Sequence, residues 1–226
     1  HTVAMTGDGV NDVLALKEAD CSIAMASGTD AARNAAELVL LESNFDAMPQ
    51  VVAEGRRCIN NVERSSSLFL TKTVYSGLLA LLFAFITLQY PFIPIQMSLI
   101  STSCIGVPAF FLALQPNRER VQGRFLKNVL LKAIPGGLSV VVNICFILFC
   151  AGRFDLESSM VSTLCVVVAG FTGLLILFRI SKPFNWLRTL VFIAMNLIFW
   201  GGIAFFPEFF SLQRANPDLL VFMLLF

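Results

Sequence analysis

Long apolar stretches separated by short polar ones fill the last two thirds of the chain. A helix needs roughly 20 consecutive apolar residues to cross the hydrocarbon core of a bilayer. Five runs of about this length predict membrane-spanning helices, at 68–89, 92–114, 129–150, 159–178 and 188–206. A sixth run begins near Leu219 and reaches the last residue, which predicts a truncated helix over 219–226. We therefore expect residues 68–226 to form an all-α, polytopic membrane domain of about six helices.

The first 45 residues show shorter apolar runs, interrupted by glycine-containing turns. Strands are expected at 1–6 and 21–25 and a short β-rich run at 37–41, with helices at about 11–18 and from about Asp30. The order strand, glycine turn, helix, strand is typical of an α/β domain with a parallel sheet. Ligands of such sheets bind beyond the carboxyl ends of the strands, so residues 6–12 should lie at the functional edge.

A helical pattern joins these two parts at 46–67. Apolar or small residues recur there at spacings of four, four and three, at Val51, Gly55, Ile59 and Val62. Pro49 would fall in the first turn, where proline is tolerated. A helix unbroken from about Asp46 to Gln89 would be on the order of 65 Å long. Such a stalk can transmit movement between the cytoplasmic part and the membrane, or serve only as a linker.

Composition excludes an ordinary soluble protein. Of the 226 residues, 57% are hydrophobic and 14% are charged, whereas soluble domains carry about a quarter charged residues. Residues 1–66 hold 15 of the 31 charged residues, which places a division near Ser66. The net charge of +1 gives no reason to expect nucleic acid as a partner. Because the chain begins with His1 and ends inside an apolar run, we expect a fragment of a longer protein.

The basic residues between the apolar runs predict the orientation in the membrane. Two of the connecting segments are basic, and they carry Arg118, Arg120, Arg124 and Lys127, and Arg179, Lys182 and Arg188. The intervening connections hold only Arg153 and Arg214 beside acidic residues. Lysine and arginine favour the cytoplasmic side, and the same parity makes residues 1–67 cytoplasmic.

The string T-G-D-G-V-N-D at 6–12 concentrates polar chemistry directly after the first expected strand. Glycines at 7 and 9 allow a sharp turn and a close approach to a bound group. The carboxylate of Asp8 can ligate Mg²⁺, while Asn11 and Asp12 can orient the metal's waters or a phosphate. The alternative is an ordinary turn with Asp12 as a helix cap. The complete string after a strand favours the metal-binding interpretation, with Thr6, Gly7 and Gly9 around the bound group.

The run TGDGVNDVLALKEADCSIAMASGTDAARNAAELVLLESNF (6–45) closely resembles the hinge segment of P-type ATPases, within their haloacid dehalogenase-like phosphorylation domain. The resemblance implies that Asp8 is the ligand of the catalytic Mg²⁺, supported by Asn11 and Asp12. It continues more loosely through 59–62, 94–96 and 106–108. The implied fold is the α/β end of that Rossmann-like domain (1–45), a stalk helix (46–67) and the family's last six membrane helices (68–226).

Other motifs of the family are absent from this sequence. It has no D-K-T-G-T string with the phosphorylated aspartate, no T-G-E loop and no nucleotide-binding domain. The resemblance therefore implies an ATP-driven pump in the bacterial plasma membrane, of which this chain alone should be inactive. ATP would be bound mainly by the missing part, and no obligatory protein partner is implied.

The first two apolar runs depart from the pattern of calcium- and sodium-type pumps, because they contain no Asp or Glu. Ile105 stands at the family's usual Asp position, and Ser76 and Thr73 at its Glu and Asn positions. Lys72 is the only charge in these runs. A charge at membrane depth is a functional candidate, although this lysine could instead extend to the cytoplasmic surface. The candidate transport residues are Lys72, Thr73, Ser76, Ser101 and Cys104.

Three functions fit these observations. The first is an ATP-driven pump for a cation that the sequence does not identify, working through an aspartyl phosphate with Mg²⁺. The second is a P-type translocase for lipid or another bulky substrate, suggested by Lys72 and the missing carboxylates. The third is a membrane-anchored phosphatase with the same aspartate and Mg²⁺ chemistry.

Overall fold

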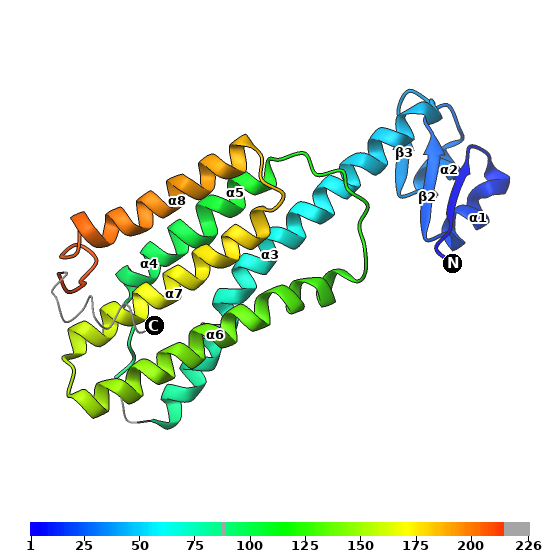
Figure 1. Ribbon diagram of the computed structural model, residues 1–226. Coiled ribbons are helices and arrows are strands. Elements are labelled where there is room, and N and C mark those ends of the chain that lie inside the picture. Colours follow the sequence, from blue (N-terminus) through cyan, green and yellow to red (C-terminus); the bar gives the residue numbers. More distant parts are fainter. Residues whose placement is uncertain (87–88, 215–226) are drawn as a thin grey trace. The chain divides into compact units, whose positions relative to one another are not determined.

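The computed structural model describes residues 1–86 and 89–214, and these divide between Gly55 and Arg56 into two compact units. The helices and strands of both units are drawn in Figure 1. Each unit has its own core, and the two are described separately below.

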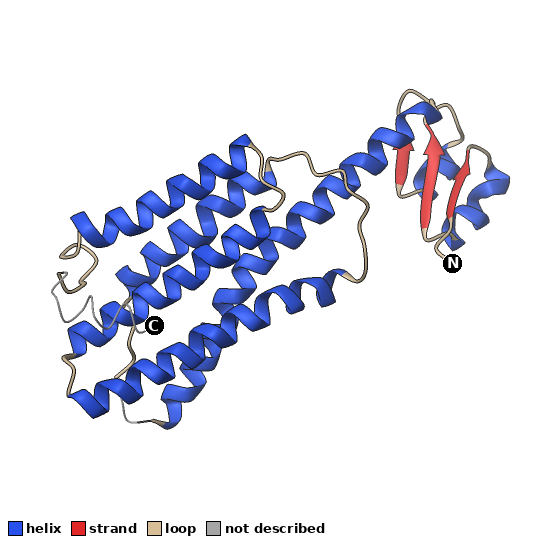
Figure 2. Cartoon of the chain, in the orientation of Figure 1, coloured by secondary structure: helices blue, strands red, loops and turns tan. Residues whose placement is uncertain are grey.

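The first unit contains a three-stranded parallel sheet in the order β1-β2-β3 (Figure 2). The strands are β1 (Ala4–Gly7), β2 (Cys21–Met25) and β3 (Leu38–Leu40). The central strand carries a buried run, Ser22 to Ala24, as expected for a strand covered on both faces. The parallel sheet is confirmed, and a strand lies in each expected segment, but the first strand begins at Ala4 instead of residue 1 and extends to Gly7.

Two short helices connect the strands, α1 (Val13–Glu18) and α2 (Asp30–Ala35). The expected helix over 11–18 begins instead with a 3₁₀ turn, Val10–Asp12, before α1. The hydroxyl of Thr29 accepts a hydrogen bond from the amide of Ala32, which caps the start of α2. Leu16 of α1 and Ala32 of α2 complete a core with the apolar strand residues Ile23, Ala24 and Leu40.

Helix α3 (Met48–Phe85) is a continuous helix of 38 residues, preceded by a 3₁₀ turn at Phe45–Ala47. At 1.5 Å per residue it is about 57 Å long. The expected end at Gln89 is wrong, because Ile86 already lies outside the helix. An uninterrupted apolar run gives no signal for where a helix ends inside it, and this explains the error.

The second apolar run forms three pieces instead of one regular helix. These are α4 (Pro94–Ser101), a π-helical segment (Thr102–Gly106) and α5 (Val107–Ala113). Pro108 has no amide hydrogen to donate to the preceding turn, which favours a change of hydrogen-bond register here. The break was not predicted, because the apolar residues continue through it.

The remaining described spans are α6 (Phe125–Phe154), α7 (Ser158–Ser181) and α8 (Trp186–Phe205). Together with α3 and the α4–α5 segment they give five helices long and apolar enough to cross a membrane, among residues 1–86 and 89–214. These five correspond to the five complete runs of the sequence. The sixth expected helix, over 219–226, lies outside the described residues.

Helix α7 is the most buried of the five spans and packs against α4, α6, α8 and the π-helical segment. Close packing depends on glycine at Gly170, where a Cβ atom would lie 2.0 Å from the ring of Phe199. Phe199 itself is fully buried. The membrane unit is thus a bundle arranged around α7.

The connection between α5 and α6 is held against α3 by two adjacent asparagines. The side-chain amide of Asn60 donates to the carbonyls of Asn117 (3.3 Å) and Glu119 (2.9 Å). That of Asn61 donates to the carbonyls of Ala113 (2.8 Å) and Gln115 (2.9 Å). We call these four hydrogen bonds the asparagine clasp.

Candidate functional sites

The first candidate site is the loop after β1, which is ordered by the side chain of Asp12. Its Oδ2 atom accepts hydrogen bonds from the backbone amides of Asp8 (3.1 Å) and Gly9 (3.0 Å). A Cβ atom at Gly7 would lie 2.6 Å from the Cβ of Asp12, so this position needs glycine for steric reasons. The Asp12 carboxylate thus fixes the backbone conformation on both sides of Asp8.

The loop after β2 supports the same aspartate from the neighbouring strand. The amide of Thr29 donates to the carbonyl of Asp8 at 2.8 Å. A Cβ atom at Gly28 would lie 2.6 Å from that carbonyl oxygen, so only glycine allows the two loops to approach this closely. This role of Gly28 and Thr29 was not predicted. Their position just after the next parallel strand was the available signal.

These residues fit a magnesium ion that keeps most of its water ligands. The side chains of Asp8 and Asn11 are exposed at the carboxyl edge of the sheet. Within the described residues, no three His, Cys, Asp or Glu side chains form a group that could hold a metal. Mg²⁺ commonly takes one or two protein carboxylates together with several waters, so a single exposed carboxylate at Asp8 is compatible with such a site. Because Oδ2 of Asp12 already accepts two hydrogen bonds, that residue positions Asp8.

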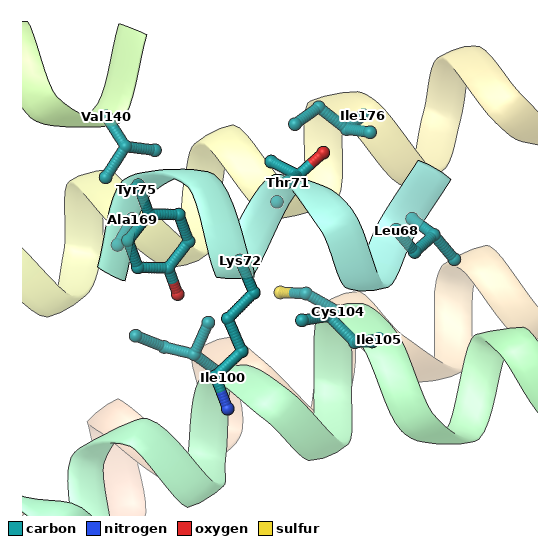
Figure 3. A pocket seen from close by; sticks show the side chains of 11 residues that line it. Leu68, Thr71, Lys72, Tyr75, Ile100, Cys104, Ile105, Val140, Ala169 and Ile176 are labelled. Atoms are coloured by element: carbon teal, nitrogen blue, oxygen red, sulfur yellow. The ribbon is translucent and has the colours of Figure 1, made fainter. Parts of the chain in front are cut away.

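The second candidate site surrounds Lys72 in the membrane bundle. The Lys72 ammonium donates to the hydroxyl of Ser101 at 2.5 Å, and that hydroxyl donates to the carbonyl of Met97. Figure 3 shows the lysine extending from α3 past Ile100 to the facing helix. It lines a cavity of about 20 Å³, room for roughly one water molecule, together with Tyr75 and Cys104.

The structure brings some of the five transport candidates together and leaves others apart. Lys72 and Ser101 are in contact, and Cys104 lines the cavity, where its thiol donates to the carbonyl of Gly170. The hydroxyls of Thr73 and Ser76 donate to carbonyls of their own helix, and neither residue lines the cavity.

Two further features of this site were not recognised in the sequence. Tyr75 lies three residues after Lys72, hence on the same helix face, and its buried hydroxyl has no hydrogen-bond partner among the described residues. Gly173 of α7 allows close approach, because a Cβ atom there would lie 2.9 Å from the Cβ of Cys104. The helical spacing could have identified Tyr75. Gly173 could not be identified without knowing which helices are neighbours.

The two units define the class of protein. Residues 1–52 match the family of haloacid dehalogenase-like hydrolases, in agreement with the parallel sheet and its glycine loop. The five apolar helices make the second unit a membrane domain. The protein is a multi-pass integral membrane protein that carries a haloacid dehalogenase-like segment, as the sequence predicted.

Curated relatives narrow this class. The chain is 42% identical to the calcium-transporting ATPase CtpE of Mycolicibacterium smegmatis over 96% of its length. It is 43% identical to CtpE of Mycobacterium tuberculosis over 98% of this chain. It is 39% identical to the probable cation-transporting ATPase exp7 of Streptococcus pneumoniae over 100% of this chain. The chain spans only 29–31% of the length of these relatives.

These similarities confirm the resemblance to cation-transporting P-type ATPases. The chain is homologous to such proteins over nearly its whole length.

Proposed function

We propose that this chain forms part of an ATP-driven P-type pump that transports a cation across the bacterial plasma membrane. The main support is the combination of the Asp8 loop with a membrane bundle in one chain that is homologous to cation-transporting ATPases. The phosphorylated aspartate and the nucleotide-binding domain would lie in other parts of the pump.

Within this proposal the Asp8 loop supports transfer of a phosphoryl group. A bound Mg²⁺ would neutralise charge that develops on this group. The Asp8 carboxylate would hold the metal, with the exposed amide of Asn11 beside it for a water or a phosphate oxygen. Asp12 would keep the loop in place through its two backbone hydrogen bonds. Thr6, Gly7 and Gly9 would form the surrounding backbone.

We further propose that the cavity beside Lys72 belongs to the transport path. The relatives named as calcium-transporting ATPases make calcium the first cation to test. However, the runs 68–89 and 92–114 hold no carboxylate, the ligand type that Ca²⁺ prefers. The ammonium of Lys72, bonded to Ser101, would act as a tethered positive charge that reduces the number of cations carried.

The decisive experiment replaces Asp8 in the full-length protein. Asp8→Asn keeps the size of the side chain but removes the charge that attracts Mg²⁺. We expect ATP hydrolysis to fall by several powers of ten, because the metal supplies several kcal/mol of transition-state stabilisation. Glu18→Gln is a matched control, since Glu18 is an exposed carboxylate at the end of α1. Wild-type hydrolysis by a folded Asp8→Asn variant at saturating Mg²⁺ would refute the proposal.

A further inference from the structure

Two adjoining hollows form a groove along helices α6 and α7. The first has a volume of about 470 Å³ and is lined by four basic side chains, Arg64, Lys132, Arg179 and Lys182. The second has a volume of about 380 Å³ and is largely apolar, with Val167, Phe171 and Trp200 in its wall. Ser139, Thr172 and Leu175 line both hollows, so the groove is continuous from its basic end to its apolar end.

The basic end has an excess of positive charge. Only one of the four cations has a carboxylate partner in the described part of the chain, since Lys132 pairs with Glu63 at 2.5 Å. Lys182 lies 4.8 Å from the ring of Phe178, and Arg179 is exposed. None of the described residues that line this hollow is acidic. The hollow therefore suits an anion.

Arg64 is the basic residue of this hollow that lies on α3, and it is half-buried. Its Nη1 atom is buried and has no hydrogen-bond partner among the described residues. A buried, charged donor without a partner is costly, and a phosphate oxygen is a suitable acceptor for guanidinium. The same side chain lines the basic hollow. The buried Nη1 atom is closed to an ion in the hollow, so Arg64 contributes its positive charge to the hollow and not this donor.

The length of the groove matches one leaflet of a bilayer. On α6 the lining residues are Lys132, Gly136, Ser139 and Asn143, at spacings of four, three and four, which place them on one helix face. From Lys132 to Asn143 the helix rises by roughly 16 Å. Half of a hydrocarbon core is about 15 Å thick. The basic end also belongs to the side that the lysine and arginine distribution predicts to be cytoplasmic.

We propose that this groove binds one anionic phospholipid of the cytoplasmic leaflet. The phosphate would lie among Arg64, Arg179 and Lys182, and an acyl chain would lie along Leu175 and Phe171. Basic pockets between transmembrane helices on the cytoplasmic side are known to bind anionic lipid headgroups. A soluble anion would use the basic end but leave the apolar end without a ligand, so the continuous groove favours a lipid. The proposal does not depend on which cation the protein transports.

The test measures lipid retained by the full-length protein. The protein is equilibrated with an equal mixture of phosphatidylglycerol and phosphatidylcholine in detergent, and bound lipid is counted by native mass spectrometry. We expect wild type to retain phosphatidylglycerol in preference to phosphatidylcholine. Arg179→Gln and Arg64→Gln should each reduce this retention roughly fivefold, the effect typical of one basic residue near an anionic surface. The matched control is Lys127→Gln, an exposed lysine on the same side that does not line the groove.

Two further arms separate a lipid from a free anion. Leu175→Trp fills the groove where the hollows meet and should reduce retention without any change in charge. Glycerol phosphate, which carries the headgroup charge but no chains, should not displace the lipid. Equal retention of both lipids by wild type, equal loss in the Lys127→Gln control, or displacement by glycerol phosphate would overturn the proposal. Arg179 is exposed, so its variant remains informative even if Arg64→Gln does not fold.

Discussion

Gly7 and Gly9 flank the same aspartate, but the structure places different demands on them. A side chain at Gly7 would collide with Asp12, whereas a Cβ atom at Gly9 would have its nearest neighbour at 3.5 Å. The backbone of Gly9 is extended, with φ −105° and ψ 166°, which any residue can adopt. The sequence predicted a common role for both glycines, in the turn and in close approach to a bound group. In the structure, steric exclusion of a side chain applies to Gly7.

This difference predicts unequal effects of alanine. Gly7→Ala should displace the loop and lower formation of the phosphorylated intermediate on the order of 100-fold, because small misplacements of catalytic groups are this costly. Gly9→Ala should leave the loop intact and retain most of the activity. Incorporation of labelled phosphate from ATP by both full-length variants provides the comparison. Equal loss in both would mean that Gly9 is also needed for close approach to a bound group.

The role of Lys72 in cation selectivity can be tested with Thr73 as a control, because the Thr73 hydroxyl does not face the cavity. Lys72→Ala should change the dependence of ATP hydrolysis on the cation while phosphorylation from ATP survives, because the tethered charge beside Ser101 is lost. Thr73→Val is the control, since the Thr73 hydroxyl donates a hydrogen bond to the carbonyl of Phe69 in its own helix and Thr73 does not line the cavity. A panel of monovalent ions, divalent ions and lipids in reconstituted protein gives the profiles. Identical profiles for wild type and Lys72→Ala would exclude a role in selectivity.

At the scale of elements, the sequence predicted where the helices lie better than where they end or change hydrogen-bond register. Apolar runs of sufficient length identified all five described spans. The π-helical segment Thr102–Gly106 and the end of α3 at Phe85 were missed, because hydropathy hardly changes at either place. The contact between Lys72 and Ser101 could not be predicted for a different reason. It depends on the relative register of two helices, which no pattern within one helix specifies.

Helix packing around α7 predicts a sharp difference between two glycines. Gly170→Ala would place a methyl group against the ring of Phe199 in the bundle core. Overpacking of this kind costs about 1–3 kcal/mol, so thermal unfolding of the purified protein should shift to a lower temperature. Gly201→Ala is the control, because the nearest atom to its Cβ would be 3.9 Å away. A Gly170→Ala variant as stable as the control would contradict the packing described here.

At the scale of the whole molecule, the charge distribution predicts one orientation. The segments 115–128 and 179–188 should be cytoplasmic, and the connection between α6 and α7 should lie outside. A cysteine introduced at Gln122 should therefore resist a membrane-impermeant thiol reagent in intact cells, whereas one at Ser158 should react. The six native cysteines are replaced first, and permeabilised cells show that both positions are reactive when accessible. Labelling at Gln122 as fast as at Ser158 in intact cells would contradict the predicted topology.

The asparagine clasp links α3 to the end of α5 and to the α5–α6 connection. Sliding or rotating α3 past this connection would break four hydrogen bonds at once, and two of the acceptor residues, Gln115 and Asn117, are buried. It is easier for the connection to travel with the helix. Helix α5 is short and begins directly after the π-helical segment. A displacement of Ala113 would therefore reach the π-helical segment within about two helical turns. Asn60 and Asn61 therefore tie α3 to the end of α5, seven residues beyond the π-helical segment.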